Sequence, residues 1–248
     1  MFRAEDRERV QDRLLDLAAA DEAVVGAAIV GSQAAGQADR WSDIDVNLAV
    51  DGPLDAVLER WTRRLYDDFG AVHHWDLPVR TAVYRVFLLP GVLEADLAFV
   101  PAADFGPSGP HWRPVFGIAG SRRASAAAPD VGGLAGLAWH HALHARISIE
   151  RRRWWQAEHW ISALRDQVIT LACLRLGLPA AYAKGAHLLP AEVTDALAET
   201  LVGSLTEAEL RRALGAVSSA VLAELERSDA ELTDRLRPAF EEAAAPAG

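Results

Sequence analysis

Two aspartates, Asp43 and Asp45, flank one apolar residue in the segment SDIDVNLAV. The pattern predicts a strand over residues 45–50, and residues two apart on a strand point to the same face, about 6.8 Å apart. The two carboxylates therefore lie on one side of the strand, while Ile44 enters the core. Without a nearby lysine they repel each other unless a cation lies between them, and Mg²⁺ prefers such oxygen ligands. The pair predicts a magnesium site; the alternative is that Asp43 caps a turn.

The residues Gly31 and Ser32 end the apolar run VVGAAIV, which predicts a buried strand over residues 24–30. A helical turn is expected to begin near Gln33. Glycine lets a ligand approach the backbone closely, and Ser32 offers a hydroxyl group. The first N–H groups of a helix can bind an anion. A phosphate-binding turn beside a carboxylate pair predicts a site for a nucleoside triphosphate.

A third carboxylate, that of Asp96, interrupts the apolar segment VLEADLAFV. The dipeptide Pro90-Gly91 predicts a type II turn, so this segment and the preceding TAVYRVFLL form a hairpin. A carboxylate on an apolar strand is costly to bury without a partner. The position therefore favours a functional role for Asp96, with Glu94, two residues earlier on the same face, as the weaker competitor.

The elements that must position these residues divide the chain into two halves. The first half alternates helical and strand patterns, with helices expected over residues 5–19 and 54–65, and Gly70 ending the second. A segment rich in Pro, Gly and Ser follows. Beyond it the pattern predicts helices with N-caps at Thr206 and Ser228, over residues 134–149, 152–176, 190–202, 206–226 and 228–243. We therefore predict an α+β fold with a mixed-sheet domain over residues 1–105, a connecting loop over 106–130 and a helical domain over 131–248.

Together, Gly31-Ser32, a ten-residue spacer, Asp43-Ile44-Asp45 and the later strand residue Asp96 resemble the nucleotidyltransferase superfamily of DNA polymerase beta. The α/β half followed by helices is similar in layout to the aminoglycoside and lincosamide nucleotidyltransferases. The resemblance implies that Asp43, Asp45 and Asp96 bind Mg²⁺ with the nucleotide. It also implies that the Gly-Ser turn holds the triphosphate. In that family the third acid, or another carboxylate at the cleft, takes the proton from the attacking hydroxyl.

One position departs from the family pattern. Relatives often carry a basic residue shortly after the Gly-Ser turn, where this chain has Ala35. Arg40, in the same loop, or Lys184, in the helical half, is expected to supply the missing charge to the phosphates. Glu158 is a second candidate for the catalytic base, because a helical-domain glutamate has that role in some relatives. The alternative is that Glu158 belongs to a solvated helix face.

The histidines His140 and His144 have the i, i+4 spacing of metal ligands, but ordinary helix histidines are the favoured interpretation.

Composition limits the remaining classes of function. The chain has 248 residues, of which 51% are hydrophobic and 24% charged, as in a globular protein that buries its own core. Its net charge of −10 favours a small or cationic partner and gives no reason to expect nucleic-acid binding. The charged start and the lack of a long apolar run predict a cytoplasmic protein with no membrane contact. A single cysteine, Cys173, excludes an internal disulfide and a Cys-rich zinc site.

These observations predict an enzyme that transfers a nucleoside monophosphate, AMP in the first instance, from ATP or another NTP to a hydroxyl group, with Mg²⁺ as cofactor. The expected acceptor is a small molecule such as an aminoglycoside-like or lincosamide-like antibiotic, which implies a role in antibiotic resistance. Two alternatives stay open. One is a protein-modifying AMP transferase of the antitoxin type, and the other is a nucleotide-binding module without catalytic activity.

Overall fold

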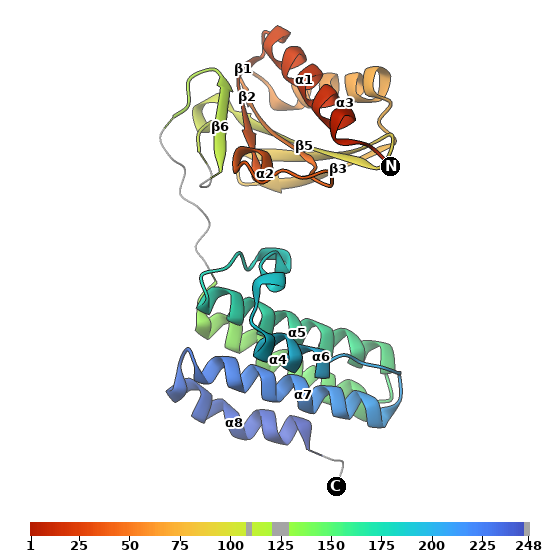
Figure 1. Cartoon of the computed structure of the whole chain (residues 1–248), viewed down its shortest axis with the longest axis vertical. Coiled ribbons are helices and arrows are strands. Elements are labelled where there is room, and N and C mark those ends of the chain that lie inside the picture. Colours follow the sequence, from red (N-terminus) through yellow and green to blue (C-terminus); the bar gives the residue numbers. More distant parts are fainter. Residues whose placement is uncertain (108–110, 121–128, 246–248) are drawn as a thin grey trace. The chain divides into compact units, whose positions relative to one another are not determined.

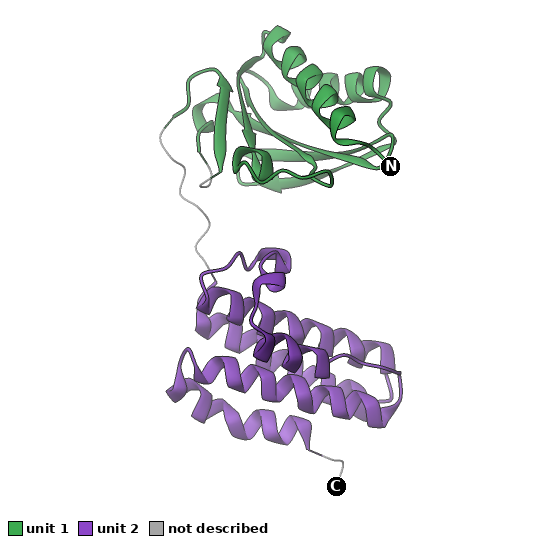
Figure 2. Cartoon of the chain, viewed as in Figure 1, with its two compact units in different colours: residues 1–126 green, residues 127–248 purple. Residues whose placement is uncertain are grey.

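A six-stranded mixed sheet forms the centre of the first of two units, residues 1–126 (Figure 1 and Figure 2). Its strands lie in the order β3-β4-β5-β2-β1-β6. They are β1 (Val24–Val30), β2 (Ile44–Val50), β3 (His73–Val79), β4 (Ala82–Leu89), β5 (Leu93–Pro101) and β6 (Trp112–Phe116). The pair β2–β5 is parallel and the other pairs are antiparallel. The computed structural model describes every residue except 108–110, 121–128 and 246–248.

Two helices, α1 (Ala4–Ala20) and α3 (Leu54–Phe69), pack on one face of this sheet (Figure 1). Trp61 of α3 meets Phe99 of β5 edge to face, with ring centroids 5.8 Å apart. Every second residue of the central strands enters this core: Ile44, Val46, Leu48, Ala95, Leu97 and Phe99. Because side chains alternate along a strand, the residues between them point to the opposite face. That second face carries Asp45 and Asp96, and we call it the aspartate face.

Several predicted elements of this unit are confirmed. The hairpin forms between β4 and β5 around Pro90-Gly91. The helix α3 ends at Gly70, whose φ of 67° is the left-handed conformation that glycine adopts easily. The helical turn expected near Gln33 is present as the single-turn helix α2 (Gly31–Ala34), which begins two residues earlier than expected. The unit also contains a short 3₁₀ helix, η1 (Ala102–Asp104).

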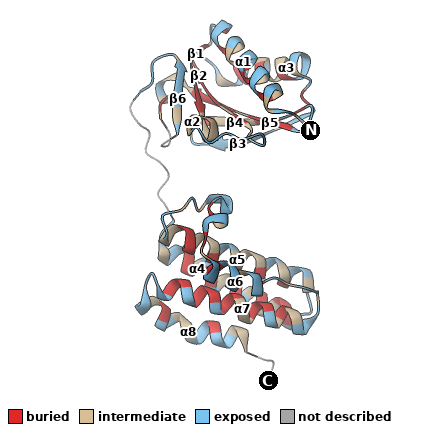
Figure 3. Ribbon diagram, viewed as in Figure 1, coloured by how far each residue is buried: buried red, intermediate tan, exposed pale blue. Residues whose placement is uncertain are grey.

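The structure differs from the sequence pattern at two strands, β3 and β6. The strand β6 falls in the segment 106–130 that was expected to be a connecting loop, and it pairs with β1, with Val30 opposite Trp112. The interruptions at Pro110, Pro114 and Gly117 hide its strand character. β3 is exposed along most of its length at the sheet edge, so it lacks the apolar alternation of a half-buried strand (Figure 3).

The second unit, residues 127–248, is helical. Its helices are α4 (Val131–Glu150), α5 (Trp154–Arg175), α6 (Ala191–Glu199), α7 (Glu207–Glu226) and α8 (Ala230–Ala244), with two short 3₁₀ helices, η2 (Ala181–Ala183) and η3 (Ala186–Leu188). The fold is therefore α+β, as predicted. A buried stripe of small residues on α4 lets the helices approach closely: Ala135, Ala138, Ala142 and Ala145. Among the described residues, no helix has the length and apolarity needed to cross a membrane.

Helix caps explain where two of these helices begin. Thr206 caps α7 as predicted, with its side chain accepting a hydrogen bond from the backbone N–H of Glu209. The Glu209 carboxylate accepts from the backbone N–H of Gly203. The predicted cap of α8 at Ser228 is wrong by one residue. Asp229 fills that role, because its carboxylate accepts from Leu232.

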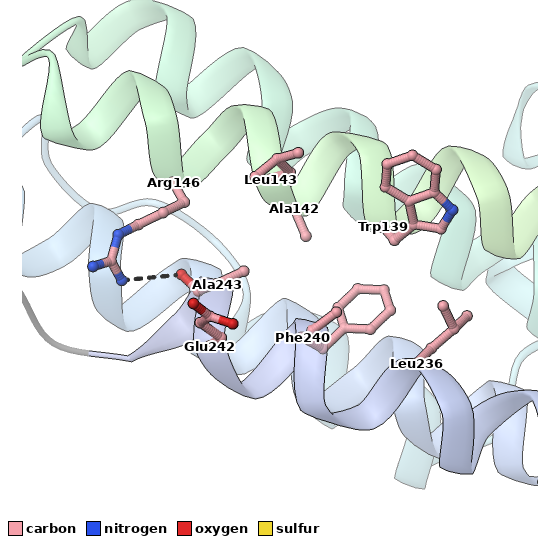
Figure 4. A pocket seen from close by; sticks show the side chains of 9 residues that line it. Trp139, Ala142, Leu143, Arg146, Leu236, Phe240, Glu242 and Ala243 are labelled. Atoms are coloured by element: carbon pink, nitrogen blue, oxygen red, sulfur yellow. Dashed lines mark hydrogen bonds between the residues drawn. The ribbon is translucent and has the colours of Figure 1, made fainter.

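An apolar cavity of about 420 Å³ lies between α4 and α8 of the helical unit (Figure 4). Trp139 and Leu143 line it from α4, and Leu236 and Phe240 from α8. At one end, Arg146 donates a hydrogen bond to the carbonyl of Ala243 (Figure 4). This guanidinium therefore satisfies the last turn of α8. None of the residues predicted for the nucleotide site lines this cavity.

Candidate active site

The aspartates Asp45 and Asp96 lie directly opposite each other on neighbouring strands. They are Cα partners in the parallel pair β2–β5, so their side chains point to the same face of the sheet. Their chain neighbours Ile44 and Ala95 are fully buried in the core on the other face. Asp43 comes immediately before β2 and is half-buried. The fold thus brings two of the predicted carboxylates together, at the end of β2 where Asp43 adds a third.

The environment of Asp96 disfavours its charged form. Burial, together with the negative charges of Asp43 and Glu94, raises the pKa of Asp96 to about 6. The Asp96 Oδ1 atom is buried and has no hydrogen-bond partner among the described residues. Buried polar atoms in folded proteins almost always have a partner. A buried carboxylate oxygen without a partner, next to a second acid, is therefore typical of a group that binds a ligand or a proton.

The turn at Gly31 shapes the other side of this cluster. Gly31 has a φ of 66°, and a Cβ atom built on it would lie 2.1 Å from the Oδ2 atom of Asp45. The sequence pattern suggested that glycine here leaves room for a ligand, but the structure shows that the Asp45 carboxylate takes that space. Ser32 follows, and its Oγ atom is buried without a partner among the described residues. An unpartnered hydroxyl beside the carboxylates is available to a phosphate oxygen.

The donor set suits a hard divalent cation. Three carboxylates supply only oxygen ligands, and the partnerless Asp96 oxygen has an unmet need for positive charge or a proton. No three metal-binding side chains among the described residues already lie close enough to hold an ion. Rotation of the aspartate side chains would have to draw them together around it. The oxygen ligands therefore suit Mg²⁺. The role of Asp43, Asp45 and Asp96 as its ligands stays a prediction.

The loop that carries Arg40 is anchored to the same unit. Buried Arg7 of α1 donates to the Asp39 carbonyl, and the Asp39 carboxylate accepts from the backbone N–H of Trp41. Arg40 itself is exposed, and its guanidinium carbon lies 4.1 Å from the centroid of the Trp41 ring. The structure thus places Arg40 in the loop between the Gly-Ser turn and β2. Its contact with phosphate stays a prediction.

The residues Glu158 and Lys184 belong to the helical unit. Glu158 accepts a hydrogen bond of 2.6 Å from Ser162, whose hydroxyl in turn accepts one from Arg165. Arg165 also donates to the Thr200 hydroxyl. These side chains therefore form a hydrogen-bond network within the helical unit. Lys184 is exposed beside η2. The catalytic role of Glu158 and the phosphate contact of Lys184 stay predictions.

The predicted histidine pair of α4 has an aromatic partner. The His140 and His144 ring centroids are 4.3 Å apart, and Trp160 of α5 packs against both rings. This packing accounts for the two histidines without a ligand.

The residue Trp112 is a candidate that sequence reasoning missed. It lies on β6 opposite Val30, directly before the Gly31 turn, and its indole Nε1 is buried without a partner among the described residues. An indole N–H can only donate, so it suits a phosphate or hydroxyl oxygen. Phe105 supports the ring edge to face, with centroids 5.4 Å apart. The only sequence signal was an aromatic residue within a segment interrupted by prolines.

No family model and no curated protein matches the sequence. One solved structure that it resembles is an aminoglycoside 6-adenyltransferase from Bacillus subtilis. The two share 10% sequence identity at a TM-score of 0.41, over 99% of this chain and 100% of that chain. The function proposed below rests on the residues of the aspartate face and not on this likeness.

Proposed function

We propose that this protein is a nucleotidyltransferase that moves AMP from ATP to a hydroxyl group of a small molecule and releases pyrophosphate. The observation that carries the proposal is the register of β2 and β5, which sets Asp45 opposite Asp96 beside the Gly31-Ser32 turn. Carboxylates that face one another beside a turn with an unpartnered hydroxyl are groups that transfer of a nucleotide through a divalent cation would use. The order of these residues along the chain also supports a nucleotidyltransferase.

In this mechanism Asp43, Asp45 and Asp96 would hold Mg²⁺. The cation would supply positive charge that neutralises the triphosphate and favours in-line displacement. Ser32 and Trp112 each offer an unpartnered donor to the phosphate oxygens. Arg40 adds a positive charge from the neighbouring loop.

The role of Asp96 includes that of a proton acceptor. Without a bound cation the pKa of Asp96 is raised to about 6. A bound Mg²⁺ would lower this pKa, so the carboxylate would be ionised at neutral pH and able to accept a proton. The acceptor oxygen forms a bond to the α-phosphorus while the bond from that phosphorus to the pyrophosphate oxygen breaks. The hydroxyl proton passes to the Asp96 carboxylate. The products are the AMP ester of the acceptor and pyrophosphate.

The acceptor that the proposal favours is a small molecule of the antibiotic class, aminoglycoside-like or lincosamide-like. An acidic aspartate face suits an acceptor that carries amines.

The test is a coupled assay of pyrophosphate release from ATP and Mg²⁺ across a panel of hydroxyl-bearing acceptors. We expect release that depends on both the acceptor and the metal. ATP binding in calorimetry without release for any acceptor would indicate a binding module instead. An AMP-sized increase in the intact mass of a partner protein, with no small-molecule product, would indicate a protein-modifying transferase.

A further inference from the structure

A small cavity lies over β3 and β4, next to the strand β5 that carries Asp96; Asp96 itself does not line it. Its volume is about 250 Å³, and its lining includes His73, Trp75, Val86, Leu88 and Glu94. We name it the Trp75 cavity. We propose that it is the acceptor subsite and that it takes a protonated amine with an aromatic or aliphatic ring, a molecule that also carries the reacting hydroxyl. This inference rests on the proposed function, and it names the substrate class more narrowly.

The strand register places the Trp75 cavity next to the proposed base. Trp75 of β3 pairs with Val86 of β4, and Val86 pairs with Asp96 of β5. One row of residues therefore runs across three strands from the indole to the carboxylate. Paired residues share a face, and neighbouring strands are about 4.8 Å apart. An acceptor seated against Trp75 can thus present its hydroxyl to Asp96.

A second row supplies the charge. His73 of β3 pairs with Leu88 of β4, and Leu88 pairs with Glu94 of β5. Glu94 is exposed at the rim of the cavity, and its negative charge adds to that of Asp96 when both are ionised. Among the described residues, neither lysine nor arginine lines the cavity. Its rim therefore attracts a cation and repels a free phosphate.

Trp75, Val86, Phe87 and Leu88 give the cavity an apolar part, which sets the rest of the ligand's chemistry. Trp75 is 54% exposed and Leu88 is 40% exposed, so both side chains are accessible to a ligand. The face of an indole ring attracts cations as well as rings. A highly hydroxylated polycation would leave this apolar surface unused. A ring-bearing amine covers the surface and pairs its charge with Glu94.

A second copy of this chain is the competing occupant, because β3 is the edge strand of the sheet. Pro78 lies within β3 and has no N–H to donate to another strand. Asp76, also on β3, carries a charge, which further disfavours edge-to-edge pairing. The hollow between Trp75 and Glu94 suits a small ligand better than a flat protein surface. The edge is therefore protected, while the cavity beside it is accessible.

The test measures binding of phenylethanolamine to the full chain by ligand-observed NMR titration, without ATP or Mg²⁺. Phenylethanol lacks the amine and ethanolamine lacks the ring, so the three probes separate the two contacts. We expect phenylethanolamine to bind most tightly. Trp75→Ala should weaken its binding about tenfold, and Glu94→Gln about threefold. The matched control is Trp155→Ala, which removes an exposed tryptophan from the helical unit and should change nothing.

Equal affinity of the three probes, or an unchanged affinity in a Trp75→Ala variant with a native circular dichroism spectrum, would overturn the proposal. If Trp75→Ala does not fold, Trp75→Phe keeps a ring and should retain most of the affinity, while Glu94→Gln still reports the charge. A dimer that Trp75→Ala converts to a monomer, with no probe bound, would assign the face to a second copy instead. The proposed function fails separately. If Trp75→Ala releases pyrophosphate with an unchanged KM for the acceptor, the assignment of the acceptor subsite is wrong while the proposed function still stands.

Discussion

The pKa values of two aspartates of the first unit, Asp21 and Asp96, shift in opposite directions although burial raises both. Burial tends to raise the pKa of Asp21, but hydrogen bonds from Arg60, Ala23 and Trp61 outweigh it and lower the pKa. The Asp21 carboxylate accepts from Arg60 at 2.8 Å and from the Trp61 indole at 3.0 Å. At Asp96 burial acts in the same direction, but no donor within the described part of the chain opposes it, and the pKa rises to about 6.

The difference separates a structural carboxylate from a functional one. Around Asp21, Arg60 and Trp61 of α3 and the backbone N–H of Ala23 donate hydrogen bonds that offset the cost of removing the charge from water. Around Asp96, the neighbouring charged groups are themselves acids, and one carboxylate oxygen stays without a partner among the described residues. Folding alone does not explain an uncompensated acid. A ligand that brings positive charge does, and perturbed pKa values cluster at functional sites for this reason.

The largest expected effect is on turnover at the aspartate face. Asp45→Asn keeps the side-chain shape but removes the charge opposite Asp96. Metal ligation is worth several kcal/mol in such reactions, so we expect pyrophosphate release to fall about 10⁴-fold. Asp51→Asn makes the same change at an exposed position just after β2 and should leave release unchanged. Full activity in Asp45→Asn at saturating Mg²⁺ would remove the metal role from this face.

Two glycines of one loop, Gly31 and Gly36, test whether the close approach of Gly31 to Asp45 matters for nucleotide binding. Gly31 and Gly36 both have positive φ, so replacement by alanine strains the backbone at either position by about 1–2 kcal/mol. Only at Gly31 would the new Cβ collide with Asp45; at Gly36 no atom lies within 4 Å. We therefore expect Gly31→Ala to weaken MgATP binding about 100-fold in calorimetry and Gly36→Ala to change it little. Equal losses would mean that backbone strain alone matters.

Much of this site follows from the sequence, because its residues lie at strand ends whose patterns are strong. The apolar runs before Gly31 and after Asp43 predict β1 and β2, and the Pro90-Gly91 turn predicts the partner strand of Asp96. Alternation along each strand then decides which side chains face the core. The residue types of the proposed cluster are local information of this kind.

The parts that the sequence did not predict depend on contacts between distant segments. Trp112 and Trp75 lie on edge strands with prolines, where the apolar alternation is broken. Their place beside the aspartates comes from pairing with β1 and β4, which no local pattern encodes. Asp21 shows the same limit, because its partner Arg60 is far along the chain. The contact between Gly31 and Asp45 likewise needs the full turn.

A smaller effect is expected on stability at the structural carboxylate. Asp21→Ala leaves Arg60 without its ion pair and the buried Trp61 indole N–H without an acceptor. We expect the free energy of unfolding at pH 7 to fall by about 3 kcal/mol in urea titrations. Because folding lowers the pKa of Asp21, its contribution is present above about pH 4 and is lost as the pH falls further. Asp16→Ala, at an exposed position on α1, should cost less than about 0.5 kcal/mol.

The smallest effect has the opposite sign, and it tests the comparison most directly. The folded-state pKa of Asp96, about 6, lies above the unfolded value of 3.8, so the folded protein holds an extra proton between those values. Its stability therefore falls as the pH rises from about 4 to 6, and the loss persists at higher pH.

Asp96→Asn removes this penalty, since the amide has no charge to desolvate. We compare the free energies of unfolding of the variant and the wild type in EDTA. As the pH rises from 4.5 to 7.5, the difference between them should grow by about 2 kcal/mol in favour of the variant, after allowance for partial exposure. Asp21→Ala measured over the same pH range should show a loss that does not change with pH, because the lowered pKa of Asp21 keeps this carboxylate ionised above about pH 4. A gain for Asp96→Asn that does not change with pH would mean that Asp96 is already paired, and the distinction between the two aspartates would fail.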